Sequence, residues 1–249
     1  MDMVLLETHE LVKVYSGRTV VDKVSLVVHD REIVGLLGRN GAGKTTTFRM
    51  TIGMVVPDGG KVIFEGRDIT KMPMYQRARQ GMGYLSQEPS VFQRLSVEQN
   101  LLAILETMSL TRRDRHRRAD ELIEQFSLEK VRRQHARLLS GGERRKLEIA
   151  RALVTNPSLI LLDEPFSGVD PIAVEDLQKE IRRLQEKGIS ILITDHNVER
   201  TLEVVDRGYI INEGTVLAYG PPQELVKNEL VRKTYLGETF RGDEFDRNG

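Results

Sequence analysis

Hydrophobic and polar positions alternate in short runs along the first third of the chain. Residues 4–15 and 19–30 are rich in β-branched side chains in a partly alternating pattern, which is typical of strands, and a Ser-Gly pair between them predicts a turn. Helical spacing in residues 45–54 predicts a helix, with Met50 and Met54 filling gaps in the core. Short apolar runs predict further strands at 31–38, 61–66 and 81–85.

Helical periodicity dominates from about residue 89 to about residue 155, and afterwards strands and helices alternate. Alternation of this kind implies parallel strands joined by crossover helices. We therefore predict an α/β fold, with a mostly parallel core sheet, an N-terminal antiparallel β part and a helical insertion. The expected organisation is one domain over residues 1–249, with the core in 1–88 and 156–249 and the helical insertion in about 89–155.

The composition excludes several classes of function. The 37 basic and 37 acidic residues give no net charge, which argues against a global nucleic-acid footprint. The chain has no cysteine, so it has no disulfide, no thiolate zinc site and no cysteine nucleophile. The start lacks the pattern of a signal peptide, and no apolar run reaches the ~18 residues of a membrane span. We expect a soluble intracellular protein that can still dock on a membrane partner.

The predominantly basic stretch "RRDRHRR", residues 112–118, invites a nucleic-acid interpretation. They belong to an amphipathic helical pattern without interleaved aromatic residues, so a solvated face explains them better. We therefore expect no nucleic acid among the partners.

The sequence "GRNGAGKTT", residues 38–46, has the pattern of a phosphate-binding loop, the Walker A motif. It follows an apolar strand and opens a helix, which is the context that this motif requires. Its glycines let backbone N–H groups surround phosphates, Lys44 supplies a positive charge to them, and the Thr45 hydroxyl can bind Mg²⁺. The alternative is a glycine-rich turn without a ligand.

A second motif supplies the acidic groups that such a loop needs. Four apolar residues, 159–162, place Asp163 at the carboxyl end of a buried strand, where ligands sit in open α/β sheets. Asp163 is therefore our candidate for holding Mg²⁺. Glu164 follows directly and can polarise an attacking water, although a solvated loop acid is the plainer alternative.

The stretch "LLSGGERRKLEIARAL", residues 138–153, has the features of another anion site. Ser140, Gly141 and Gly142 precede a helical run, and a helix N-terminus presents free N–H groups and the positive end of the helix dipole. Locally, the same residues also fit an ordinary N-cap, in which Ser140 and Glu143 form a capping box.

The complete set of motifs resembles the ATP-binding cassette (ABC) ATPases, the motor subunits of transporters, over essentially the whole chain. Residues 139–153 match the family signature, and residues 38–46 and 159–165 match its Walker A and Walker B motifs. The resemblance implies a RecA-like P-loop NTPase core and the cofactors ATP and Mg²⁺. It assigns catalysis to Lys44, Gln87, Glu164 and His196, and Mg²⁺ to Thr45, Gln87 and Asp163. It assigns nucleotide binding to Tyr15, which stacks on adenine, and to Arg39, Asn40, Gly41, Ala42, Gly43, Lys44, Thr45 and Thr46.

The resemblance also implies why one chain carries two anion sites. In the family, two subunits pair head to tail, and the signature of one covers the γ-phosphate held by the other. We therefore expect a homodimer in which the contacts to the partner's nucleotide come from Ser140, Gly141, Gly142, Glu143 and Asp170. ATP then acts as a shared ligand that holds the dimer closed, and hydrolysis releases it.

Three stretches, residues 87–103, 161–174 and 192–214, resemble the ATPase of lipopolysaccharide export transporters. That resemblance implies a peripheral position on the cytoplasmic face of the inner membrane, under permease subunits: the LptF and LptG pair, with LptC. Branched-chain amino-acid importers are the nearest alternative, and a soluble non-transport ATPase is a further one. Phe92 is our candidate for coupling to the permease, and a core position in the helical insertion is the alternative.

Overall fold

The antiparallel strands of the first third form a sheet of their own. The structure, a computed structural model, describes residues 3–88 and 90–236. In this sheet the strand order is β2-β1-β4-β5, and every neighbouring pair is antiparallel. Its strands are β1 (Val4–Tyr15), β2 (Arg18–His29), β4 (Gly59–Phe64) and β5 (Arg67–Asp68).

A second, mostly parallel sheet forms the core, in the order β10-β9-β3-β8-β7-β6. All its neighbouring pairs are parallel except β9 with the edge strand β10. This arrangement confirms the predicted α/β class with an antiparallel N-terminal part. The strands are β3 (Ile33–Leu37), β6 (Met82–Leu85), β7 (Leu159–Asp163), β8 (Ser190–Asp195), β9 (Arg207–Asn212) and β10 (Thr215–Gly220).

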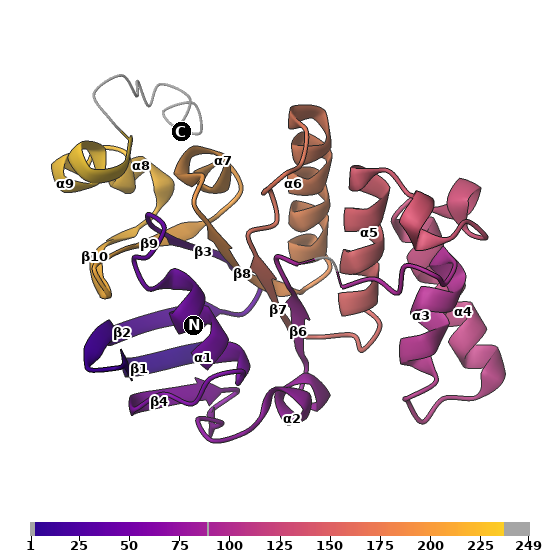
Figure 1. Cartoon of the computed structure of the whole chain (residues 1–249), viewed down its shortest axis with the longest axis horizontal. Coiled ribbons are helices and arrows are strands. Elements are labelled where there is room, and N and C mark those ends of the chain that lie inside the picture. The colour runs from indigo at the N-terminus through magenta and orange to yellow at the C-terminus, as the bar shows by residue number, and fades with distance from the viewer. Residues whose placement is uncertain (1–2, 89, 237–249) are drawn as a thin grey trace.

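The helices cover both faces of the parallel sheet and extend beyond it (Figure 1). Short single turns lie at Glu129–Val131, Ala136–Leu138 and Arg232–Leu236. The α-helices are α1 (Lys44–Ile52), α2 (Met74–Arg79), α3 (Val97–Leu105), α4 (Arg112–Gln125), α5 (Gly141–Ala152), α6 (Pro171–Glu186), α7 (Val198–Leu202), α8 (Pro222–Leu225) and α9 (Glu229–Val231).

Two hydrophobic clusters meet at the parallel sheet because alternate residues of a strand point to opposite faces. On β7, Leu159 and Leu161 join a cluster with α1 and the antiparallel sheet. Ile160 and Leu162 of the same strand join the other cluster, with α5, α6 and α7. Helix α1 is therefore held between the two sheets, and its N-terminus is fixed beside the carboxyl ends of β3 and β7.

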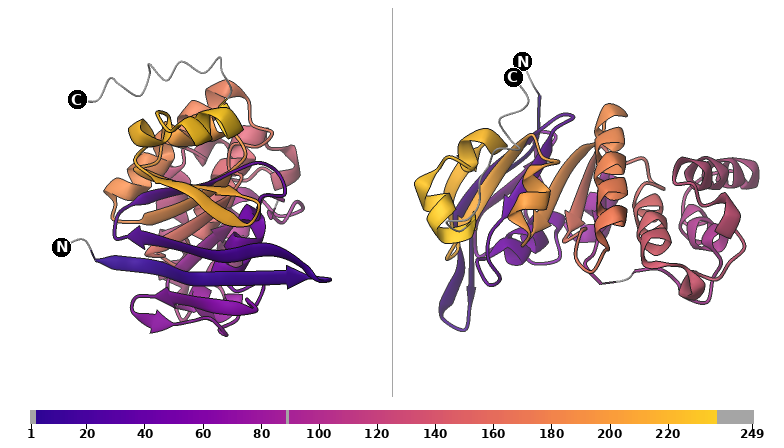
Figure 2. Two further views of the ribbon diagram at one scale, coloured as in Figure 1. Left: turned by 90° about the vertical axis from the view of Figure 1, so that its left-hand side faces the viewer. Right: turned by 90° about the horizontal axis from the view of Figure 1, so that it is seen from above.

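Helices α3, α4 and α5 lie together beyond α6, on the side away from the antiparallel sheet (Figures 1 and 2). This confirms a helical insertion between β6 and β7, while its limits at residues 89 and 155 stay predictions. One core prediction is wrong. Helix α1 ends at Gly53, which has a left-handed φ of 84°, so Met54 turns outward and is 51% exposed, whereas Met50 is buried.

Among the residues that the structure describes, no helix combines the length and the apolar character needed to cross a membrane.

Candidate active site

The loop between β3 and α1 has a backbone that requires glycine at two positions. Gly38 has φ 157° and Gly43 has φ 106°. A Cβ on Gly38 would lie 2.4 Å from the carbonyl oxygen of Ile211, and one on Gly43 would lie 2.7 Å from that of Val20. The strand, the loop and the following helix therefore adopt the compact geometry that the Walker A pattern predicted.

The N-terminus of α1 is suited to an anion. Gly43 caps it without a side-chain hydrogen bond, and its first turn contains no acidic residue, so its N–H groups face no carboxylate of their own turn. Lys44 is buried, and its Nζ donates to the carbonyl oxygens of Gly38 at 2.6 Å and Arg39 at 3.0 Å. Burial lowers the pKa of Lys44, and the nearby Glu164, Asp195 and Asp163 carboxylates partly offset this.

The other loop residues expected to bind nucleotide surround Lys44 in sequence and differ in exposure. Three are exposed, Thr45 and Thr46 are half-buried, and Ala42 and Gly43 are buried. The exposed ones are Arg39, Asn40 and Gly41.

Asp163 ends β7 as a buried carboxylate. Thr194, on the neighbouring strand β8, donates its hydroxyl to Asp163 Oδ1 at 2.9 Å, and the Tyr84 hydroxyl lies 3.5 Å from Oδ2. Burial, together with the Asp163 charge, raises the pKa of Tyr84 to about 12, so this phenol keeps its proton at neutral pH. These two hydroxyls fix the orientation of the carboxylate that sequence reasoning assigned to Mg²⁺.

Glu164 is placed by an unusual backbone. Its φ of 46° is left-handed, and its N–H donates to the carbonyl oxygen of Thr194 at 2.8 Å. Non-glycine residues rarely adopt this conformation, and it is often found at functional sites. The turn directs the side chain toward two residues from other elements: Gln87 Nε2 donates to Glu164 Oε2 at 2.9 Å, and His196 Nδ1 lies 3.3 Å from the same oxygen.

Asp195 is a part of the site that sequence reasoning missed. It is buried, accepts from the Asn197 N–H at 2.8 Å through Oδ1, and lies 3.6 Å from His196 Nδ1. Burial raises the pKa of its carboxyl group, and its Oδ2 has no hydrogen-bond partner among the described residues. The signal in the sequence is the acid that ends an apolar run directly before His196, as Asp163 ends one before Glu164.

Three oxygen donors of the expected metal site come from different elements: the Thr45 hydroxyl from α1, the Gln87 amide from the loop after β6, and the Asp163 carboxylate from β7. Hard oxygen ligands with a single carboxylate, completed by phosphate oxygens, are typical of Mg²⁺ sites in phosphate-transferring proteins. Within residues 3–88 and 90–236 we find no group of three or more His, Cys, Asp or Glu arranged to hold a metal without such help.

The signature motif has the local cap that its sequence predicted. Ser140 is the N-cap of α5: its hydroxyl accepts from the Glu143 N–H at 3.3 Å, and its own N–H donates to the Glu143 carboxylate at 2.9 Å. Gly141 is exposed, has no positive φ, and a Cβ there would meet nothing within 4 Å. Among the residues that the structure describes, none therefore requires glycine at this position, which is consistent with close approach of a group from another molecule.

The signature lies apart from the loop that carries Lys44. Figure 1 shows α6 standing between α5 and the strands β7 and β8. Asp170 caps α6 through a hydrogen bond from the Ala173 N–H at 3.0 Å, and a Cβ on Gly142 would lie 3.6 Å from the Ala173 side chain. The structure thus groups Gly142 with the N-terminal turn of α6 that Asp170 caps, and groups Lys44 with Asp163, Glu164, Gln87 and His196.

Two aromatic side chains expected to bind other molecules are exposed. Tyr15 is 45% exposed at the end of β1. Phe92 is 49% exposed, and the Arg151 guanidinium lies 4.7 Å from its ring centroid. The alternative that placed Phe92 in the core of the helical insertion is therefore wrong.

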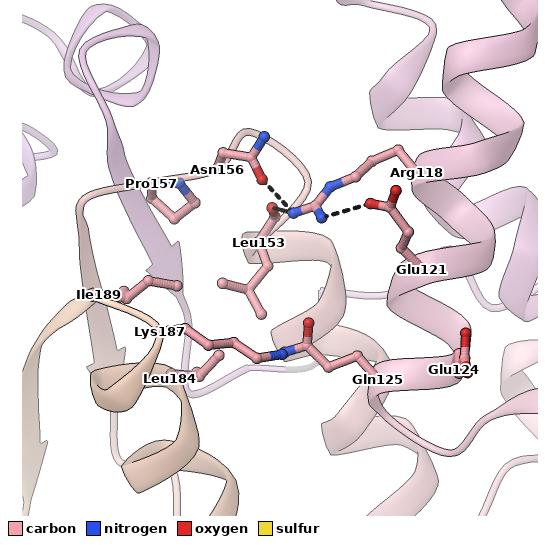
Figure 3. A pocket seen from close by; sticks show the side chains of 11 residues that line it. Arg118, Glu121, Glu124, Gln125, Leu153, Asn156, Pro157, Leu184, Lys187 and Ile189 are labelled. Carbon is pink, nitrogen blue, oxygen red and sulfur yellow. Dashed lines mark hydrogen bonds and ion pairs between the residues drawn. The ribbon is translucent and has the colours of Figure 1, made fainter.

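A hollow of about 630 Å³ lies elsewhere, between α4 and the end of α6 (Figure 3). Arg118 of α4 lines one edge of it and donates to the carbonyl oxygen of Leu153 at 2.9 Å and to Asn156 (Figure 3). Leu153 is the C-cap of α5, so Arg118 places a cation at the negative end of the signature helix. This gives the side chain a structural role.

Comparison with known proteins agrees with the geometry. The family model described as ABC transporter matches residues 21–167, more than half of the chain. The chain belongs to this family and is an ABC ATPase.

Among its relatives, the lipopolysaccharide export system ATP-binding protein LptB of Haemophilus influenzae is 52% identical over 240 residues, which covers 96% of this chain and all of the relative. LptB of Escherichia coli has the same identity and coverage. A probable ABC transporter ATP-binding protein of Azorhizobium caulinodans is 54% identical over 231 residues, 93% of this chain and 82% of the relative.

Solved structures share the whole architecture. The ADP conformation of MJ1267, an ATP-binding cassette of an ABC transporter, has a TM-score of 0.86 at 28% identity, covering 95% of this chain and all of that one. CbiO1 of Clostridium perfringens, part of the transporter complex CbiONQ, has a TM-score of 0.85 at 27% identity, covering 99% of this chain and all of that one.

Proposed function

We propose that this chain is the ATP-hydrolysing motor of a lipopolysaccharide export transporter. The observation that carries the proposal is the 52% identity to LptB over the full length of that protein. The grouping of Glu164, Gln87 and His196 around one carboxylate oxygen supports the hydrolytic part of the role.

Hydrolysis follows from the chemistry of the grouped side chains. Phosphates lie on the N–H groups at the start of α1, where Lys44 adds a positive charge. Thr45, Gln87 and Asp163 hold Mg²⁺, which when bound neutralises charge on the phosphate oxygens. Glu164 accepts a proton from the attacking water, and His196 orients Glu164 and contacts the γ-phosphate.

A second copy of the chain completes each site. Helix α5, which begins at Gly141 after the N-cap Ser140, and helix α1, which begins at Lys44, lie on opposite sides of α6 (Figure 1). Ser140, Gly141 and Gly142 therefore serve a nucleotide held by a partner. The pair closes head to tail around two ATP molecules, with Glu143 and Asp170 at the same boundary. Loss of the γ-phosphate removes the ligand that both subunits share, and the dimer opens.

Closure and opening drive permease subunits in the inner membrane, where the chain lies peripherally on the cytoplasmic face. The partners are the LptF and LptG pair, with LptC, and the cargo is lipopolysaccharide extracted toward the outer membrane. Phe92 is the contact to a permease, because its exposed ring and the Arg151 cation beside it form an amphipathic anchor.

Purification of the tagged chain with its untagged partners from the native host tests this function. Permeases that carry lipopolysaccharide support it. Amino-acid permeases would instead assign the chain to an importer, and recovery with ribosomes or DNA would assign it a role outside transport.

A further inference from the structure

Tyr15, which we assign to stacking on adenine, lies at the end of β1, where the antiparallel sheet is only two strands wide. Strand β4 pairs with β1 only as far as Val12, which lies opposite Gly59. Beyond that point β1 has β2 as its strand neighbour, joined by a tight turn in which Ser16 and Gly17 both have positive φ. A two-stranded ribbon is marginally stable alone, so the position of Tyr15 depends on contacts from elsewhere.

Those contacts come from the turn between α1 and β4. Asp58 accepts two hydrogen bonds from the end of β1: the Val14 N–H donates to Oδ2 at 2.7 Å, and Lys13 Nζ donates to Oδ1 at 2.9 Å. Lys13 Nζ also donates to the carbonyl oxygen of Val56 at 2.9 Å. One carboxylate and one ammonium therefore fasten the ribbon to residues 56–58.

The Lys13 ammonium group also lies near the Tyr15 ring itself. Lys13 Nζ lies 5.5 Å from the centroid of the Tyr15 ring, within the range of a cation–π contact. The two side chains therefore lie side by side, although the register of β1 with β2 shifts between Lys13 and Val14. Lys13 thus limits the orientations of the ring.

Hydrogen bonds also join this turn, between α1 and β4, to helix α1 itself. The N–H groups of Met54 and Val55 donate to the carbonyl oxygen of Arg49 in α1, at 2.9 and 3.1 Å. Helix α1 therefore meets the phosphates at its start and reaches the Tyr15 ribbon from its end.

We propose that Lys13 and Asp58 are positioning residues of the adenine site, which set the height and tilt of the Tyr15 ring relative to the phosphate-binding loop. The inference rests on the proposed adenine contact of Tyr15, and it does not depend on the cargo of the transporter. Neither residue touches the nucleotide; both act through Tyr15.

The test compares a ligand that contains adenine with one that lacks a nucleobase. Calorimetric titration with ADP and with tripolyphosphate, both with Mg²⁺, is applied to Asp58→Asn and Lys13→Met. Base–aromatic stacking is worth roughly 5-fold to 150-fold in affinity, and loosening the platform removes part of that. We expect the Kd for ADP to rise about threefold to tenfold, while the Kd for tripolyphosphate, the melting temperature and kcat stay unchanged and the KM for ATP rises.

Asp68→Asn is the matched control, because Asp68 is an exposed carboxylate of the same sheet that accepts a backbone N–H, from Thr70 at 2.9 Å. It should leave both affinities unchanged. Tyr15→Ala tests the adenine contact separately from the positioning role of Lys13 and Asp58. A loss of ADP affinity in Tyr15→Ala, with none in Asp58→Asn or Lys13→Met, would overturn the positioning role alone. No loss in Tyr15→Ala would remove the adenine contact and the positioning role with it. An equal loss for ADP and tripolyphosphate would also contradict the proposal.

Discussion

Gln87 donates its Nε2 hydrogen to Glu164 Oε2 at 2.9 Å, although the two residues are 77 positions apart in the sequence. The contact joins the loop that leaves β6 for the helical insertion with the acid at the end of β7. The amide of Gln87 therefore helps to orient the carboxylate that we assign to the attacking water. This hydrogen bond links the segment that we propose contacts a permease to the residue that we propose acts in hydrolysis.

Replacement of Glu164 by glutamine tests the assignment of the base. The amide has nearly the same shape but cannot accept a proton, so we expect steady-state ATP hydrolysis to fall by at least about 100-fold. ATP affinity should stay close to that of the wild type, because the phosphate contacts are intact. Glu175→Gln, an exposed glutamate of α6, is the control and should hydrolyse normally. Normal turnover in Glu164→Gln would exclude Glu164 as the base.

The Ser140 hydroxyl has both a local role and a proposed role toward the partner, and a matched variant separates them. Ser96 forms the same kind of capping box, with Gln99, at the start of α3. Ser140→Ala and Ser96→Ala should each cost about 1 kcal/mol of stability. We expect only Ser140→Ala to slow ATP hydrolysis, with ATP affinity of the monomer unchanged. Equal turnover in the two variants would reduce Ser140 to a helix cap.

Phe92→Ala should leave the isolated protein as stable and as active as the wild type, because the ring is half-exposed and contributes little to the core. We expect this variant instead to assemble poorly with permease subunits, so that less permease co-purifies with it. Tyr75→Ala, an exposed aromatic on α2, should assemble normally. A Phe92→Ala protein with a lower melting temperature and normal assembly would contradict the role as an anchor.

Arg77 is 1% exposed and donates to four backbone carbonyl oxygens, those of Met50, Thr51, Thr70 and Met72. Burial lowers its pKa to about 10, so it remains charged at neutral pH. Arg77→Met leaves these carbonyls without their donor, and we expect a loss of roughly 3–5 kcal/mol of unfolding free energy. At ~2–4 °C per kcal/mol this is a large drop in melting temperature. Arg79 is exposed on the same helix, so Arg79→Met should change the melting temperature little. Equal melting temperatures for Arg77→Met and Arg79→Met would show that Arg77 does not stabilise the fold in this way.

The elements and motifs could be predicted because each depends on neighbours in sequence. The turn at Gly43, the cap at Ser140 and the apolar run before Asp163 all have local signals. Contacts between residues far apart in the sequence have no such local signal. Nothing in the sequence near Arg77 shows that it caps the end of α1, and Lys13 and Asp58 are 45 positions apart.

Two details show where periodicity fails. Met54 continues the helical spacing of Met50, yet the left-handed Gly53 ends the helix between them and sends Met54 to the surface. Asp195 is as buried as Asp163 and, like it, ends an apolar run; the run predicts the end of a strand, but only the packing of the sheet shows that the carboxylate is buried. In both cases backbone geometry or tertiary packing decided the outcome.

We propose that each ATP site is shared by two copies of the chain. Two variants, both in the Glu164→Gln background, break opposite halves of such a site. Lys44→Ala removes a charge-assisted phosphate contact worth roughly 1.5–3 kcal/mol. Gly141→Asp places a carboxylate where it repels the partner's phosphate, and a Cβ there meets nothing within 4 Å, so the variant should fold.

Light scattering of the two variants with ATP, separately and mixed in equal amounts, is the most direct measurement. Neither variant alone should form a dimer, since both of its sites are broken. In the mixture, the intact Lys44 of one chain meets the intact Gly141 of the other, so we expect an ATP-dependent heterodimer with one complete site. A mixture that remains monomeric with ATP, while the Glu164→Gln parent dimerises, would contradict it.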